Sequence, residues 1–574
     1  MKKIPYAIAN WKQMNEENGY FIDKTKYLEK LEKYVAPVFL RPRRFGKSLM
    51  CSIQECYYDI NLKDRFNELF KDTYIGQNPT SEKNMYMILR LDFSKVGISS
   101  DISKIEDNFN GILKNNLIKF CHFYPEHLID IDINSNNISL ALDTILSRIE
   151  IYDLPKMYVI IDEYDNFTNQ LITSGKDAVY KKITSGEDDS FLKTFFKILK
   201  EGTQSQTIKR VYITGVLPIT IDDLSSGFNI AKIITLKEEF LSMLGFTQTE
   251  VNKYLEDVIR DYEITNVNIE SVKDILKNFY EGYKFAVNAE PLYNSTIVTF
   301  FLEEFASAKE IPEFFIDPNL KTDVNWIRRL TVKESNTKEM LEEIIFTGGL
   351  KYNRERLTNS FDANTFFEPD FYPCSLFYLG MLTIDDNENM VIPNQTMQSI
   401  FAVYFNDVER YHIDQQYNDI FIQFRKDLDI NALFAGYWEI YIGQFPALMF
   451  EKANENFFRS TFYELCRRHL SSDFVFEIEV NQHGGRTDLE FLGKWTSQYK
   501  NMKYLVEFKH FNNTDTVLWN NLKVPRQKDK DQLAVYEKAI AKKYPELTIT
   551  KWMIYTYKGK DWKVFKINNK KGTV

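Results

Sequence analysis

The sequence is poor in the residues that build disulfide frameworks and zinc sites. Its 574 residues include only five cysteines and six histidines. The cysteines are scattered and form no CxxC pair, and the histidines show no matching spacing. This pattern disfavours a disulfide scaffold and a zinc site, and it predicts the reduced, buried thiols of a cytoplasmic protein.

Long apolar runs are also absent. No stretch approaches the roughly 18 apolar residues of a membrane span, and the richest candidate, Tyr437–Phe450, is interrupted by Glu439, Gln444 and Pro446. The apolar stretch Ile4–Ala9 is too short for the hydrophobic region of a secretory signal. We therefore expect a protein without a membrane anchor or a secretion signal.

Charge is unevenly distributed along the chain. The net charge is −9, which by itself disfavours a nucleic-acid partner. From Lys494 to Val574, however, 18 Lys and Arg stand against 7 Asp and Glu, so this segment carries +11 and the other 493 residues carry −20. Because local charge governs phosphate contact, the basic end predicts a nucleic-acid surface. A solvated lysine-rich surface is the alternative.

Residues 1–235 alternate short apolar runs with helical patterns. Met157–Ile161 is continuously apolar, as in strands that are buried on both faces of a parallel sheet. In Phe191–Lys200 apolar residues recur at helical spacing, and Gly202 is predicted to end that helix. The alternation predicts a doubly wound α/β sheet. The other predicted elements are strands at Ala36–Leu40, Tyr86–Phe93 and Arg210–Thr214 and a helix at Lys47–Tyr58.

The rest of the chain divides into a helical region and a second α/β unit. Residues 236–440 are predicted to be a mostly helical lid or linker, with a capping box at Thr247–Glu250. Residues 441–574 are predicted to be a separate domain. Polar composition predicts loops at Ile172–Asp189 and Asn512–Asp531. The C-terminal unit is expected to hold helices at Asn454–Leu470 and Asp531–Lys542 and strands at Val475–Val480, Thr487–Leu492, Tyr504–Phe508, Thr548–Tyr557 and Trp562–Ile567.

The range Gly46–Ser48, with the sequence Gly-Lys-Ser, stands between a predicted strand and a predicted helix, as in a phosphate-binding loop. There, backbone N–H groups and the helix N-terminus hold phosphate oxygens, the lysine meets the β- and γ-phosphates, and the hydroxyl holds Mg²⁺. Arg41 stands where the first glycine is expected. The alternative is an ordinary helix start, but Arg41, Arg43 and Arg44 would repel one another without an anion.

A second nucleotide-binding element follows the apolar strand Tyr158–Ile161. Asp162 and Glu163 end this strand, as the acids of a Walker B strand do. Asp162 is expected to hold Mg²⁺ through water and Glu163 to polarise the attacking water; for Asp162, a helix cap is the alternative. Thr214 ends the next strand and is a candidate sensor of the γ-phosphate, unless it is simply packed.

Two acids and a lysine near the C-terminus resemble a nuclease metal site. The midpoint between Asp488 and Glu507 falls inside the polar connection Lys494–Met502, so a symmetric hairpin would place the two acids opposite each other. Because alternate strand residues share a face, Lys509 lies on the same face as Glu507. Such a cluster can hold Mg²⁺ and orient an attacking water. The alternative is a strand pair with solvent-facing charges.

Two further residues are candidates for this site. Glu464, in the preceding helix, is a candidate third carboxylate for the metal, or a surface residue that pairs with Arg467 or Arg468. Gln532, at the start of the next helix, is a candidate contact to metal-bound water or nucleic acid, with a capping role as the alternative.

Together these residues resemble bacterial proteins with an N-terminal AAA-ATPase-like domain and a C-terminal PD-(D/E)XK nuclease domain, over nearly the full length of the chain. Arg41–Leu49 matches that family's phosphate loop, including the absent first glycine, and Gly485–Asp488 and Glu507–Lys509 match its nuclease part. The other matching segments are Tyr20–Thr25, Leu91–Ser94, Ile161–Asp165, Thr214–Val216 with Pro218, Gly245–Thr247, Glu281–Tyr283, Tyr378–Gly380, Leu382–Thr383 and Ile392–Asn394.

The resemblance implies an ATPase joined to a Mg²⁺-dependent nuclease, with nuclease chemistry at Asp488, Glu507 and Lys509. DNA is the expected substrate, and the alternatives are a nucleotide-switched nucleic-acid-binding protein with an inactive nuclease domain and an ATPase that signals through a protein partner. A homo-oligomer is a further hypothesis, because many P-loop ATPases complete their site with an arginine from a neighbour. The expected nucleotide contacts are Arg43, Arg44, Phe45, Gly46, Lys47, Ser48, Leu49, Asp162 and Thr214, with Glu163 as catalytic residue.

Overall fold

The fold is described here from a computed structural model. Its α-helices and strands extend from α1 (Trp11–Glu16) to β13 (Asp561–Ile567). Within the residues that the structure describes, none of the helices has the length and apolar character that crossing a bilayer requires. Those residues are 2–133, 138–184, 190–218, 220–221, 228–265, 267–312, 315, 340, 343–344, 349–358, 371–401, 417–445, 450, 453–482, 485–494 and 497–567.

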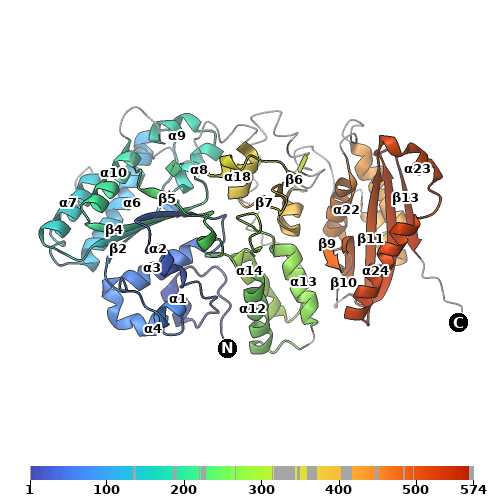
Figure 1. The fold of residues 1–574 in the computed structure, drawn as a ribbon, viewed down its shortest axis with the longest axis horizontal. Coiled ribbons are helices and arrows are strands. Elements are labelled where there is room, and N and C mark those ends of the chain that lie inside the picture. The colour runs from blue at the N-terminus through green and yellow to red at the C-terminus, as the bar shows by residue number, and fades with distance from the viewer. Residues whose placement is uncertain are drawn as a thin grey trace.

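The N-terminal part is built on a five-stranded parallel sheet in the order β2-β3-β4-β1-β5. Helices cover both faces: α1, α3 and α4 lie on one side, and α6, α7 and α10 on the other (Figure 1). Every residue of β1 and β3 is buried, which explains their continuous apolar sequences. The doubly wound α/β sheet is thus confirmed. The strands are β1 (Ala36–Leu40), β2 (Met87–Asp92), β3 (Met157–Asp162), β4 (Ile208–Gly215) and β5 (Ala231–Ile233), and the helices are α2 (Tyr27–Leu31), α3 (Lys47–Tyr58), α4 (Phe66–Phe70), α5 (Tyr74–Gln77), α6 (Ile102–Phe123), α7 (Ile138–Ile151), α8 (Asn166–Thr173), α9 (Asp177–Thr184) and α10 (Phe191–Gln204).

Two local predictions in this part are wrong. Helix α10 does not stop before Gly202 but continues to Gln204. Gly202 serves packing instead, because a Cβ there would lie 2.6 Å from Cδ1 of Ile208. The predicted loop at Ile172–Asp189 contains helix α9, which buries Tyr180 and Ile183; residues 185–189 lie outside the described residues. In both places tertiary packing overrides the local polar or glycine signal.

The middle of the chain contributes to two different hydrophobic clusters. Helices α12 (Gln248–Asp261), α13 (Ile269–Tyr280) and α14 (Ser295–Ala308) share one hydrophobic cluster, and the predicted capping box of Thr247 and Glu250 begins α12. Helix α18 (Tyr372–Tyr378) instead joins the core of the N-terminal part. A short antiparallel sheet of β6 (Gly349–Leu350), β8 (Met390–Val391) and β7 (Thr383–Ile384) joins the same core, and α17 (Glu355–Thr358) lies nearby in the chain.

The C-terminal part is a second five-stranded sheet, ordered β13-β12-β11-β10-β9. Only β11 and β12 are parallel, so the sheet is mixed. The helix α22 packs in one hydrophobic cluster with this sheet, and α24 packs in another. The elements are α22 (Glu455–Leu470), β9 (Phe474–Gln482), β10 (Gly485–Gly493), β11 (Met502–Phe511), α23 (Thr516–Asn521), α24 (Gln527–Lys543), β12 (Thr548–Tyr557) and β13 (Asp561–Ile567).

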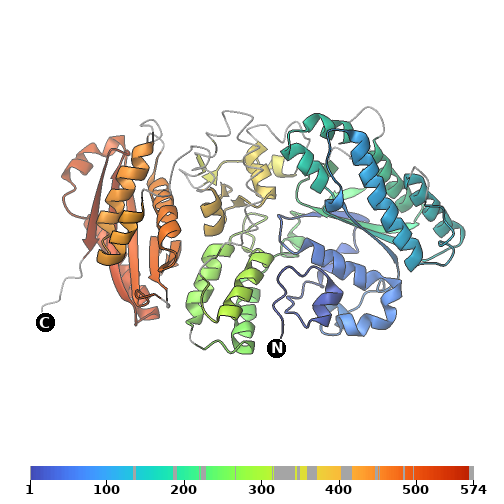
Figure 2. The same ribbon diagram turned by 180° about the vertical axis from the view of Figure 1, so that it is seen from behind.

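One predicted loop near this sheet is wrong, because packing orders it into helices. The predicted loop at Asn512–Asp531 contains α23 and the start of α24, because buried Trp519 stacks on Tyr557 with ring centroids 5.3 Å apart. Helices α20 (Asn418–Asp427) and α21 (Ile430–Gly436) share the hydrophobic cluster of α22, so they lie with the C-terminal sheet. The boundaries at 235 and 440 stay predictions. In both views α12–α14 stand between the two sheets (Figures 1 and 2).

Candidate nucleotide and metal sites

The phosphate-loop segment is a tight turn between β1 and α3. Its backbone is left-handed at Arg44, where φ is 69°, and at Gly46, where φ is 90°. Glycine adopts this conformation without strain. Among the described residues, no side chain caps the N-terminus of α3, which begins at Lys47. The first backbone N–H groups of the helix are therefore left for water or an anionic ligand.

The Lys47 side chain is buried and folds back over the turn. Its Nζ donates to the carbonyl oxygens of Arg41 at 3.0 Å and of Pro42 at 2.9 Å. Burial lowers the pKa of Lys47, while the carboxylates of Glu163 and Asp162 act in the opposite direction. A buried ammonium held by neutral carbonyls gains much more from a phosphate oxygen, because charge-assisted hydrogen bonds are the stronger ones.

Arg41 stabilises the turn from behind. It is fully buried, and its guanidinium donates to the carbonyl oxygens of Thr235 at 3.0 Å and Leu241 at 2.9 Å. The guanidinium carbon lies 3.7 Å from the ring centroid of Phe285, and burial lowers the pKa of Arg41 to about 9. The arginine in place of the usual first glycine is therefore an internal anchor of the loop, fixed by carbonyls and an aromatic ring.

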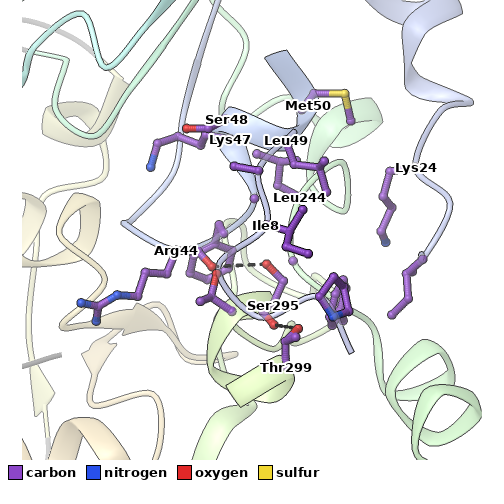
Figure 3. A pocket seen from close by; sticks show the side chains of 18 of the residues that line it. Ile8, Lys24, Arg44, Lys47, Ser48, Leu49, Met50, Leu244, Ser295 and Thr299 are labelled. Atoms are coloured by element: carbon purple, nitrogen blue, oxygen red, sulfur yellow. Dashed lines mark hydrogen bonds between the residues drawn. The ribbon is translucent and has the colours of Figure 1, made fainter. Parts of the chain in front are cut away.

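The start of helix α14 holds the backbone of the same turn. The Asn294 side chain donates to the carbonyl of Arg43 at 3.2 Å. The Ser295 hydroxyl and the Thr296 backbone N–H both donate to the carbonyl of Arg44 at 3.2 Å (Figure 3). Residues about 250 positions apart are thereby fixed against each other.

Glycine-bearing segments from the middle of the chain close around the turn. A Cβ at Gly380, where φ is 76°, would lie 2.6 Å from Cβ of Pro42. A Cβ at Gly245, where φ is 86°, would lie 3.1 Å from Cδ1 of Phe45. The ring of Tyr283 meets Phe45 edge-on with centroids 5.1 Å apart. Three segments that are distant in the sequence therefore converge on one loop.

A cavity of about 350 Å³ opens beside the phosphate loop. At one side it is lined by Lys47, Ser48 and Glu163. Elsewhere its lining is mainly apolar and comes from residues 5–24, the start of α3 and residues 244–246, including Ile8, Leu49 and Leu244 (Figure 3). A mostly apolar lining beside the polar groups of the phosphate loop suits a ligand with phosphates and a flat base.

The two predicted acids stand at the end of β3, beside the loop. Asp162 is buried; Oδ2 accepts from Arg90 at 3.4 Å, and Oδ1 has no hydrogen-bond partner among the described residues. Glu163 has a left-handed φ of 49°, and its Oε2 accepts from Asn166 at 2.6 Å. Burial raises the pKa of Glu163. A buried carboxylate oxygen without a hydrogen-bond partner can accept a hydrogen bond from a water molecule that is bound to Mg²⁺.

Thr214 lies near the end of β4, and Asp165 follows the end of β3. The Thr214 hydroxyl is fully buried and donates to the carbonyl of Phe39 at 2.8 Å, a contact that ties β4 to β1. Asp165 accepts from the backbone N–H groups of Val216 at 3.1 Å and Leu217 at 2.6 Å. This role of Asp165 was not predicted from the sequence. Its place three residues after Asp162 was the available signal.

In the C-terminal sheet, Asp488 and Glu507 lie opposite each other on β10 and β11. Leu489 pairs with Val506 in this antiparallel ladder, so the next position pairs the two acids. The N–H of Asp488 donates to Oε1 of Glu507 at 3.1 Å, and the N–H of Phe508 donates to Oδ2 of Asp488 at 2.8 Å. The predicted hairpin geometry is confirmed, and both acids are buried.

Lys509 joins the two acids. Its Nζ lies 3.6 Å from Oδ2 of Asp488 and 3.5 Å from Oε2 of Glu507. A third carboxylate oxygen, Oε1 of Glu455, lies 3.3 Å away. The structure therefore brings the three predicted residues together and adds an acid from the first turn of α22, which the sequence analysis did not select.

Glu464, the predicted third carboxylate, lies elsewhere. It follows Glu455 by nine positions in α22, roughly two and a half helical turns, which places the two side chains on opposite faces. Glu464 is buried and pairs with Arg468 at 2.8 Å. Gln532 donates to the Tyr536 hydroxyl at 2.6 Å, which in turn donates to the carbonyl of Arg486. Gln532 thus reaches the site only through Tyr536.

The acid pair fits a divalent cation. Across the described parts of the chain, no three His, Cys, Asp or Glu side chains are grouped closely enough to hold a metal by themselves. Burial and the negative charge of Asp488 nevertheless raise the pKa of Glu507 to about 9. The raised pKa indicates that nearby positive charge does not fully compensate the two carboxylates. The Lys509 ammonium lies within 4 Å of three carboxylates, which shows that these acids converge on one cation.

Two segments match known protein families. Residues 5–225 match a family described as predicted AAA-ATPase, and residues 453–566 match the PD-(D/E)XK nuclease superfamily. The first range contains the phosphate loop and Asp162, and the second contains Asp488, Glu507 and Lys509. No curated protein matches the chain. The sequence resemblance to an ATPase-like part followed by a nuclease-like part is therefore confirmed.

Proposed function

We propose that this chain binds and hydrolyses ATP and cleaves nucleic acid, with DNA as the expected substrate and Mg²⁺ at both sites. The observation that carries the proposal is the convergence of Asp488, Glu507 and Lys509 on neighbouring strands. The match of residues 453–566 to a nuclease superfamily supports it, and the match of residues 5–225 supports the ATPase part.

At the nucleotide site, each residue has a separate role that follows from its position. Lys47 exchanges its two carbonyl partners for β- and γ-phosphate oxygens, and the open N-terminus of α3 holds the phosphates. Ser48 and Asp162 hold Mg²⁺, which neutralises the developing charge. Glu163 orients the attacking water and accepts its proton. The apolar side of the cavity, including Ile8 and Leu49, excludes water around the base.

At the nuclease site, Asp488 and Glu507 hold the metal, with Glu455 as a further acid at its edge. A divalent ion there stabilises charge on the departing oxygen and lowers the pKa of bound water. Lys509 orients the attacking water through its Nζ and supplies positive charge beside the phosphate. The lysine-rich segment from Lys494 onward holds the phosphate backbone and makes binding salt-dependent.

The helical residues 395–401 connect the two sites. Met397 and Ile400 line a small cavity together with Pro42 and Arg43 of the phosphate loop. From the same turns, Gln395 donates to the carbonyl of Ile478 at 3.1 Å and Gln398 to the Ser460 hydroxyl at 2.6 Å. This physical continuity supports control of the nuclease by the nucleotide state.

The test is digestion of single- and double-stranded DNA and RNA, with and without Mg²⁺ and ATP. We expect Mg²⁺-dependent cleavage of DNA by the unaltered chain and loss of cleavage in Lys509→Ala. Equal cleavage by the two proteins would refute the site assignment. ATP hydrolysis is measured in parallel, and Lys47→Ala should abolish it while Lys509→Ala retains it.

A nucleotide-switched binding protein with an inactive nuclease is the second candidate. It is favoured by the ion pairs that Asp488 already forms with Lys509 and Arg459, because these cations stand where a metal would otherwise compensate the acid. Salt-dependent DNA binding that survives Asp488→Ala, together with no cleavage in any metal or nucleotide, would establish it.

A further inference from the structure

Arg459 lies inside the nuclease site but has no part in the chemistry described above. It follows Glu455 by one turn of α22 and is only 6% exposed. Its Nη1 donates to Oδ1 of Asp488 at 3.2 Å, and its Nη2 donates to Oε1 of Glu479 at 2.5 Å and also to the Asn456 side chain. One guanidinium therefore joins an acid of β10 to an acid of β9.

Glu479 has an unusual backbone for a strand residue. Its φ is 51°, a left-handed value that residues with a Cβ rarely adopt. The flanking pairs Thr487–Val480 and Leu489–Ile478 place Glu479 opposite Asp488. Its second oxygen accepts from Arg486 at 3.1 Å. Such strain persists only where surrounding contacts impose it, and here two arginines hold the carboxylate.

We propose that Arg459 is a positioning residue that fixes the Asp488 carboxylate for metal binding, a proposal that rests on the metal site assigned above. Arg459 holds Oδ1, and the Phe508 N–H holds Oδ2, so the carboxylate plane cannot rotate. An arginine suits this position because its planar guanidinium donates to two carboxylates at once in a fixed geometry, which the single ammonium of a lysine cannot reproduce.

The charges around the site agree with this role. Three cations stand among four carboxylates, which leaves a net negative charge for a divalent ion when all the acids are ionised. If Arg459 only neutralised Asp488 as a structural ion pair, a lysine at this position would do the same. The metal affinity would then not change on that replacement. The groups counted are Arg459, Arg486 and Lys509 against Glu455, Glu479, Asp488 and Glu507.

The test variant is Arg459→Lys, which keeps the charge and the helix propensity and removes only the fork. Mn²⁺ binding is measured by titration calorimetry on the full chain without nucleotide or nucleic acid, beside Asp488→Ala, which removes the proposed nuclease site. We expect Arg459→Lys to weaken the Asp488-dependent binding by about tenfold, the usual loss when a contact behind a metal ligand is removed. We expect the midpoint of Mg²⁺ activation of cleavage to rise to match.

Glu479→Gln is a second variant, because it keeps the side-chain shape and loosens the other end of the same contact. We expect a smaller shift in the same direction. Metal affinity within twofold of the unaltered chain in both variants would overturn the proposal, even if their melting temperatures fall. Identical isotherms for Asp488→Ala and the unaltered chain would instead refute the metal site itself, so the two failures are distinguishable.

Discussion

Asp488 and Glu507 are nineteen residues apart in sequence, yet the backbone N–H of one donates to the carboxylate of the other at 3.1 Å. Two buried acids in contact are unfavourable without positive charge, and the raised pKa of Glu507 reflects this cost. Lys509 supplies part of the missing charge. A divalent ion would supply the rest of the positive charge. The contact between Asp488 and Glu507 therefore underlies the proposed activity.

Lys47→Ala is expected to remove nucleotide binding. The Nζ of Lys47 donates to two carbonyl oxygens of its own loop, and it is placed to meet phosphates. ATP with Mg²⁺ should raise the melting temperature of the unaltered chain through mass action and should leave Lys47→Ala unchanged. Differential scanning fluorimetry measures this, with Lys509→Ala as the control that keeps the shift.

Gly380→Ala is expected to weaken ATP binding by roughly tenfold or more, because a small displacement of binding groups is costly. Its Cβ would collide with Pro42 of the phosphate loop at 2.6 Å, and its φ of 76° disfavours any side chain. Gly111→Ala is the matched control, since nothing lies within 4 Å of a Cβ there. In helix α6 that control should raise stability by about 0.5–1 kcal/mol. Equal nucleotide affinity in both variants would show that the Gly380 contact is unimportant.

Glu281→Gln is expected to stabilise the protein in a pH-dependent way. Burial raises the pKa of Glu281 to about 7, above its ordinary value of 4.5. Below pH 4.5 Glu281 is protonated in the folded and the unfolded state, so it does not lower the free energy of unfolding. Above pH 7 it is ionised in both states, and the buried charge lowers the free energy of unfolding by the full amount. The variant should gain about 3 kcal/mol at pH 8 and very little near pH 4.5. Thermal melts at the two pH values measure this, and an equal gain at both would contradict it.

Gln398→Ala is expected to uncouple the two activities. Gln398 joins residues 395–401 to Ser460, the neighbour of Arg459. ATP hydrolysis and Mg²⁺-dependent cleavage should each persist, while the effect of ATP on the cleavage rate should disappear. Gln423→Ala, which removes only a surface contact to Asp427 in α20, serves as the control. A nucleotide effect that survives in Gln398→Ala would exclude this contact as the link.

The sequence predicts strands and hairpins well where apolar runs are short and clearly bounded. Strands Ala36–Leu40 and Thr548–Tyr557 have the predicted limits, because turn residues or charges flank each run. The pairing of Asp488 with Glu507 was predictable because the connection between their strands is short, so register follows from symmetry. Local pattern and tertiary structure agree in these places.

Side-chain direction in helices was harder to predict. Glu455 and Glu464 both lie in α22 beside aromatic residues, and nothing local shows which of them faces the strands. Helix α22 is buried along most of its length, so its apolar pattern does not mark one face. The role of Arg41 was hidden for a similar reason, since its carbonyl partners near Thr235 and Leu241 come from about 200 residues away.

The most direct measurement is cleavage of double-stranded DNA at increasing Mg²⁺ by the unaltered chain and by Asp488→Asn, which keeps the side-chain shape and removes its charge. We predict Mg²⁺-dependent product from the unaltered chain and a loss of at least roughly a hundredfold in the variant, the scale on which metal-site groups contribute to hydrolysis. Equal cleavage by both proteins, or no cleavage of DNA or RNA by the unaltered chain with any divalent metal, would contradict a metal-dependent nuclease site at Asp488 and Glu507.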